Sequence, residues 1–155
     1  MTSFSISETR REINRTIKAA WDLGSVISPV PPVDWGDNQG FDKPVGTGPN
    51  DRDGRIYGRC RVISGTSRQV SVGTPIGLNT VEIIDAGVVM FDVFVVENTR
   101  QTKLEDLAGI VKTALEAGQT VGGISFELVT YRPVGPSDGM YQGQVVADFR
   151  YNRVR

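Results

Sequence analysis

Residues 81–98 read VEIIDAGVVMFDVFVVEN, and this stretch decides the fold. The run from Val88 to Val96 is the most apolar in the chain and is broken only by Asp92. A run of this kind is typical of a strand in the middle of a sheet, covered on at least one face. We therefore predict a central strand here.

Several other segments alternate apolar and polar residues, as half-buried strands do. Residues 55–64 (RIYGRCRVIS) form one of them, and residues 69–72 are expected to pair back as a short hairpin arm. Residues 124–128 form the next, with every second side chain apolar. The last is residues 141–152, where the apolar face is Tyr141, Val145, Ala147, Phe149 and Tyr151. Residues 28–35 (SPVPPVDW) are too rich in proline for a central strand and suit an extended edge segment.

Two segments have the period of amphipathic helices. Each opens with a capping-box pattern, SISE at 5–8 and TKLE at 102–105. Their apolar stripes are Ile13, Ile17 and Trp21 in the first, and Leu104, Leu107, Val111, Ala114 and Leu115 in the second. The element order predicts a single α+β domain over residues 1–155. It should contain one mostly antiparallel sheet with two helices packed on one face, plus a long polar loop.

Composition narrows the classes of function. The 155 residues include 17 basic and 18 acidic side chains, a balance that argues against general attraction to nucleic acid or an anionic membrane. No apolar run reaches the roughly 18 residues of a membrane span. The first residues lack the pattern of a signal peptide, so we expect a protein made and kept in a cytosol.

The chain has no histidine and a single cysteine. Histidine is the commonest general base and metal ligand, so its absence predicts a protein that is not an enzyme and carries no cofactor. Cys60 alternates with apolar neighbours in its strand, which predicts a buried and unreactive thiol.

Residues 36–54 (GDNQGFDKPVGTGPNDRDG) raise three interpretations. The segment does not fit a phosphate-binding loop, because it lacks the required glycine spacing and is not followed by a helix. A calcium loop is matched in part by Asp51, Asp53 and Gly54, but its first ligand position would be Pro49 and its glutamate position Cys60.

The third interpretation is an arm without a core of its own. Phe41 and Val45 are its only sizeable apolar anchors. We expect this arm to be mobile in the free subunit and to become ordered against a neighbouring molecule.

Charge is distributed unevenly along the middle of the chain. No acidic residue lies between Gly54 and Val81, whereas the following strand carries acids and no base. The basic set is Arg55, Arg59, Arg61 and Arg68, and the acidic set is Glu82, Asp85, Asp92 and Glu97.

These charges allow three interpretations. In the first, the charges neutralise each other across strands of one sheet. In the second, the basic set of one copy contacts the acidic set of the next copy in a ring. In the third, the arginines bind single-stranded nucleic acid beside Tyr57. Arg59 and Arg61 lie opposite Cys60 and Val62 in the alternation, so their reversal to glutamate is expected to cost little stability.

The layout resembles the tail terminator, or tail completion, proteins of long-tailed bacteriophages. The resemblance is carried by the leading helix, the VDW edge at 33–35, the long polar loop and the arginine-rich strand. It continues through AGVVMFDVFVVENTR at 86–100, the second helix and the closing GMYQGQVVADFRY at 139–151. The family often has an aromatic pair where this chain has Met140 and Tyr141, and the loop is long for the group.

The resemblance implies a structural virion protein of the neck, without catalytic residues. Six copies would form a ring that caps the head-proximal end of the tail tube, ends its polymerisation and contributes to head–tail joining. The implied partners are further copies, the tube protein and the head-completion (connector) protein. The implied location is the virion, after assembly in the host cytoplasm. The alternatives are another neck or tail-tube subunit, or a small single-stranded nucleic-acid-binding module that uses the arginine-rich strand.

Overall fold

The computed structural model describes residues 5–25, 27, 29–36, 40–48, 50–72, 81–97, 99–118, 120 and 122–154. Within these ranges, the side chains at positions 66, 68–72, 81, 82, 137, 153 and 154 are not described.

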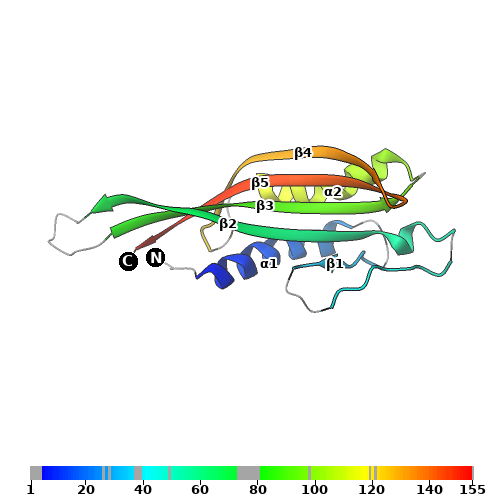
Figure 1. Cartoon of the computed structure of the whole chain (residues 1–155), viewed down its shortest axis with the longest axis horizontal. Coiled ribbons are helices and arrows are strands. Elements are labelled where there is room, and N and C mark those ends of the chain that lie inside the picture. Colours follow the sequence, from blue (N-terminus) through cyan, green and yellow to red (C-terminus); the bar gives the residue numbers. More distant parts are fainter. Residues whose placement is uncertain are drawn as a thin grey trace.

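A single mixed sheet of five strands forms the body of the protein, in the order β1-β2-β3-β5-β4 (Figure 1). The strands are β1 (Val33–Asp34), β2 (Tyr57–Val72), β3 (Val81–Val96), β4 (Ser125–Ser137) and β5 (Met140–Val154). Neighbouring strands are antiparallel except β1, which pairs in parallel with β2. The predicted central strand and the proline-rich edge segment are both confirmed.

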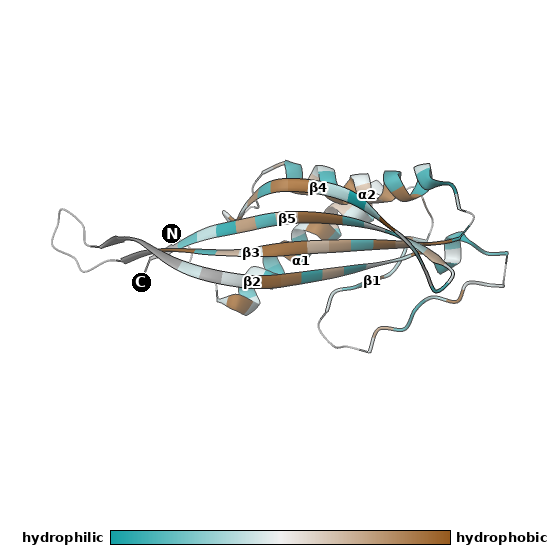
Figure 2. Ribbon diagram, turned by 45° about the horizontal axis from the view of Figure 1, so that its top comes forward, coloured by the Kyte–Doolittle hydropathy of each residue, from teal (hydrophilic) through white to brown (hydrophobic). Residues whose placement is uncertain are grey.

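The helices α1 (Ile6–Gly24) and α2 (Gln101–Glu116) contact each other and pack on the same face of the sheet (Figure 1). Helix α1 packs against β2, and α2 packs against β3, β4 and β5. The residues of β3 that face the helices are fully buried: Val89, Phe91, Val93 and Val95. The apolar colour of Figure 2 is concentrated in the middle of the strands that cover this core. The predicted α+β architecture, with two helices on one face, is therefore confirmed.

The helix stripes are confirmed, but only one of the two capping boxes is. At α1, the Glu8 amide donates to Ser5 Oγ at 3.2 Å and the Ser5 amide donates to the Glu8 carboxylate at 2.7 Å. The bond from the Ser5 amide to the carboxylate favours the charged form and is the largest cause of the lowered pKa of Glu8. At α2 the N-cap is Arg100, with no side-chain cap bond, so the capping box predicted at 102–105 is wrong. The helix begins early enough to place Thr102 inside its first turn.

Three details of the strands differ from what the sequence pattern suggests. Residues 69–72 continue β2 instead of turning back. Leu128 is 76% exposed because a register shift between Glu127 and Thr130 breaks the alternation of β4. Gln144 lies on the polar side of β5 but is only 4% exposed.

Two strand glycines make room for aromatic rings from neighbouring strands. A Cβ on Gly58 would lie 2.8 Å from the Phe91 ring, and one on Gly87 would lie 2.5 Å from the Phe149 ring. Gly87 and Phe149 are register partners in β3 and β5. The rings therefore cover the strands at positions where any side chain would clash.

Strands β2 and β3 reach past the ends of both helices as a projecting hairpin (Figure 1). The pairing of β3 with β5 extends to Glu82 and Val154, whereas β4 stops pairing with β5 at Arg150. No helix of the described residues is long and apolar enough to cross a membrane.

Candidate functional site

The face of the sheet opposite the helices carries a charged network centred on Asp92. The Asp92 carboxylate accepts from Arg59 at 3.1 and 3.3 Å, from Arg61 at 3.1 Å, and from the Gln144 amide at 2.8 Å. Arg132 Nε donates to the Gln144 carbonyl oxygen at 2.8 Å. The network thus joins β2, β3, β5 and β4 across the whole width of the antiparallel sheet.

Asp92 is fully buried, although no helix covers this face. Its side chain is 0% exposed, whereas those of Arg59 and Arg61 are 38% and 43% exposed. The guanidinium groups of Arg59 and Arg61 and the Gln144 amide surround the buried carboxylate, while both arginine side chains remain partly exposed to water. Charged hydrogen bonds of this kind are stronger than neutral ones.

This geometry corrects the expectation for the two arginines. Arg59 is the register partner of Asp92, so the two charges neutralise each other across strands, as one of the three interpretations held. Removing both cations leaves a buried carboxylate with one amide partner. The structure therefore predicts a large stability cost for changing Arg59 and Arg61, in place of the small one expected from the sequence.

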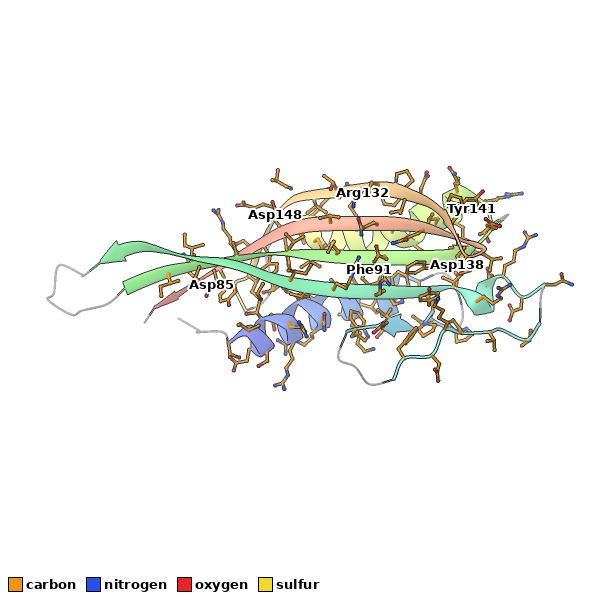
Figure 3. The ribbon with its side chains drawn as sticks, in the orientation of Figure 1. Asp85, Phe91, Arg132, Asp138, Tyr141 and Asp148 are labelled. Carbon is orange, nitrogen blue, oxygen red and sulfur yellow. The ribbon has the colours of Figure 1, made fainter. Side chains whose placement is uncertain are left out.

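The other residues of the basic and acidic sets lie elsewhere. Arg55 is half-buried beside the arm. Asp85 accepts a hydrogen bond from Ser67 and lies on the projecting hairpin, away from Phe91, the residue before Asp92 in β3 (Figure 3). The side chains of Arg68 and Glu82 lie outside the described residues. Within one chain, the structure does not bring Asp85 to Arg59 and Arg61.

The two predicted anchors of the arm differ in their contacts. The Phe41 ring lies 5.8 Å from the Tyr57 ring, and Lys43 Nζ lies 6.0 Å from the same ring. Val45 is 81% exposed. Phe41 therefore attaches the arm to the sheet, and Val45 contributes no burial within its own chain.

The end of the arm has a turn of its own. The Asp51 carboxylate accepts from the backbone amides of Thr47 at 2.9 Å and Gly54 at 3.0 Å, and these bonds lower the pKa of Asp51. Asp53 starts the short helix η1 (Asp53–Arg55) and pairs with Lys103 of α2. In the described part of the chain, no group of three acidic or cysteine side chains is placed to hold a metal ion.

A depression of about 390 Å³ lies between the arm and the sheet. Its wall includes the rings of Tyr57 and Phe94, which stack with centroids 4.6 Å apart and planes 12° apart. The lining also includes Lys43 and Arg55, Asp138 of the β4–β5 turn, and Met140 at the start of β5. The depression combines an aromatic wall with two cations and one carboxylate.

Gln144 is a site residue that the sequence analysis did not identify, and Asp92 was named there only as the break in the apolar run and as one member of the acidic set. Asp92 is the only charge inside the most apolar run of the chain, and Gln144 belongs to the polar face of an otherwise regular strand. An isolated acid in a buried strand indicates a required partner, because an unpaired buried charge is costly. That signal was present, but the partners depend on strand register.

The burial predicted for Cys60 is confirmed, and it has a consequence at high pH. Burial, and after it the nearby Asp92 charge, raise the pKa of the Cys60 thiol from its ordinary value of 9.0 to about 12. The unfolded chain then loses the thiol proton at a lower pH than the folded chain. This contribution to stability is complete below pH 9 and is lost as the pH rises towards 12.

We therefore expect the free energy of unfolding to fall more steeply with pH in this window for the wild type than for Cys60→Ala. Denaturant titrations of both proteins across the window measure the difference. If the stability of the two proteins falls equally with pH, the pKa of the Cys60 thiol is the same in the folded and the unfolded chain.

Comparisons with known proteins support the fold alone. No protein-family model matches the chain, and no curated protein matches it. A solved protein structure is similar to this chain, with a TM-score of 0.54 and 15% sequence identity. The alignment covers 92% of this chain and 95% of the other. The whole domain therefore has a known fold, and this likeness says nothing of function.

Proposed function

We propose that the chain is a structural virion protein, a tail terminator that assembles into a ring, most simply of six copies. The ring caps the head-proximal end of a phage tail tube, ends its polymerisation and forms part of the head–tail joint. Its partners are further copies, the tube protein and the connector, and its place is the virion neck. The proposal starts from the resemblance in element order, with which the α+β fold agrees.

The observation that carries the proposal is the presence of two projections at different places on one domain. The β2–β3 hairpin extends past the helices at one end, and the part of the arm over 40–48 runs beside β1 and β2 towards the opposite end (Figure 1). A ring built head to tail needs two different surfaces on each subunit. Projections with little core of their own are suited to packing against a neighbour.

The nucleic-acid alternative receives no such support. Arg59 and Arg61 already pair with Asp92, so their presence has an explanation inside the chain. Assembly distinguishes a terminator from a tube subunit of the same fold, because a tube subunit polymerises into filaments, whereas a terminator forms a closed ring.

We expect the purified chain to form closed rings, at high concentration or when tube protein is present. Light scattering and negative-stain imaging measure the mass and the shape. With tube protein, the expected result is short tubes that carry a ring at one end and stop growing. A chain that forms only a symmetric dimer under all these conditions contradicts the proposal, because a two-fold contact alone cannot build a ring of six.

A further inference from the structure

Leu128 is an outlier in the edge strand β4. Its side chain is 76% exposed and its φ is +52°, in the left-handed region that a leucine rarely adopts. It lies at the register shift between Glu127 and Thr130. Bulges of this kind re-aim a side chain, and backbone strain at an exposed site is a reason to look for a function there.

The other non-glycine residue with positive φ in the described chain is explained locally. Asp138 has φ +52° and precedes Gly139 in the tight turn between β4 and β5. Aspartate followed by glycine is the usual solution for such a turn. Leu128 has neither a turn nor burial in its own chain to account for its conformation.

The surroundings of Leu128 are acidic. Glu127 is the register partner of Asp148, and both side chains are exposed. Arg150 pairs with Glu127 at 2.7 Å, which leaves one negative charge in excess among these three residues. The exposed leucine therefore stands beside a net negative patch.

The depression beside the arm has the complementary properties. Its wall of Tyr57 and Phe94 is aromatic, and its charges are Lys43, Arg55 and Asp138, one positive charge in excess. A cavity of roughly 150 Å³ can already hold a benzene-sized molecule, so about 390 Å³ has room for a leucine side chain. Figure 3 shows Asp148, near the leucine, and Asp138, at the depression, well apart along the sheet.

We propose that Leu128 of one copy inserts into this depression on the next copy. The inference rests on the proposed ring, since it names the contact that joins neighbours. A protruding side chain and a distant pocket on the same chain form a head-to-tail contact, which can close into a ring. Burial of the Leu128 side chain against the Tyr57 and Phe94 rings and the arm, with opposite charges around it, then offsets the strain of its backbone.

The test uses the full chain with the matched changes Leu128→Asn and Leu23→Asn. Asparagine tolerates positive φ, so Leu128→Asn removes the apolar side chain while keeping the backbone conformation. Leu23 is 88% exposed on α1 and serves as the control for losing a surface leucine. We expect Leu128→Asn to weaken assembly at least tenfold without lowering the melting temperature of the monomer. Leu23→Asn should assemble like the wild type.

A charge exchange tests the depression as the acceptor. Lys43→Glu and Glu127→Lys should each weaken assembly, and the double variant should recover part of the loss, because the two charges meet across the contact. If wild-type rings form and Leu128→Asn assembles equally well, this inference is overturned and the proposed function stands. If the losses of Lys43→Glu and Glu127→Lys simply add in the double variant, the depression is not the surface that receives Leu128. A wild type that remains monomeric, even with tube protein present, overturns both proposals.

Discussion

Changing Arg59 and Arg61 together to glutamine should lower the free energy of unfolding by about 3–5 kcal/mol, although both side chains reach solvent. The reason is Asp92, whose side chain is 0% exposed and accepts from both arginines. Without them the carboxylate is held by the Gln144 amide alone. A buried charge that loses its cations carries an uncompensated desolvation cost, which exceeds the value of an ordinary surface ion pair.

Denaturant titration measures the loss directly. A domain of this size shifts its melting temperature by roughly 2–4 °C per kcal/mol, so we expect a decrease of about 10 °C. The matched control is Arg150→Gln, which breaks a pair with Glu127 whose partners are both about half exposed. That change should cost no more than about 1 kcal/mol.

Adding Asp92→Asn to the double variant removes the unpaired charge and should recover a large part of the loss. This recovery identifies the carboxylate as the cause, because a simple loss of arginine packing would not be repaired by it. A cost below about 1 kcal/mol for the double variant would mean that water already reaches Asp92.

The network also decides which experiments can test assembly. Reversing the charges of Arg59 and Arg61 would place three carboxylates together on the open face, so a failure to form rings could arise from unfolding. Leu128 has no such role in the monomer. Its substitution separates an effect on the interface from an effect on stability.

The parts of the fold that follow from local pattern could be predicted from the sequence. The Ser5–Glu8 capping box and the Ile13, Ile17 and Trp21 stripe depend on residues three or four apart, and both are confirmed. The apolar run around Asp92 predicts a buried central strand, and β3 is the middle strand of the sheet.

The parts that depend on register could not be predicted in this way. Asp92 meets Arg59 and Gln144 only because β2 and β5 pair with β3 in one particular register. The sequence pattern places Leu128 on the buried face, after Ile124 and Phe126. It is exposed because the register of β4 shifts between Glu127 and Thr130. Register is fixed by contacts between distant residues, so the candidate site was less predictable than the elements that carry it.

Trp21→Ala should be the most damaging single change in the core, with a cost of about 3–5 kcal/mol. The Trp21 ring is 1% exposed and lies 5.2 Å from the Phe91 ring. Its Nε1 donates to the Pro31 carbonyl oxygen at 2.9 Å, which ties α1 to the segment that leads into β1. Truncation therefore leaves a cavity and also removes the partner of a buried backbone carbonyl.

The same change should loosen the edge of the sheet next to the arm. The Gly58 amide donates to Pro32 at 2.9 Å, directly after the residue that Trp21 holds. Hydrogen exchange at Gly58 should therefore become faster in Trp21→Ala relative to the centre of β3. Trp21→Phe keeps most of the apolar volume and loses only the hydrogen bond, so it should cost about 1–3 kcal/mol and show the same local change. If Trp21→Phe is as stable as the wild type and Gly58 stays protected, the edge segment is held by its strand pairing alone, and α1 does not position the arm.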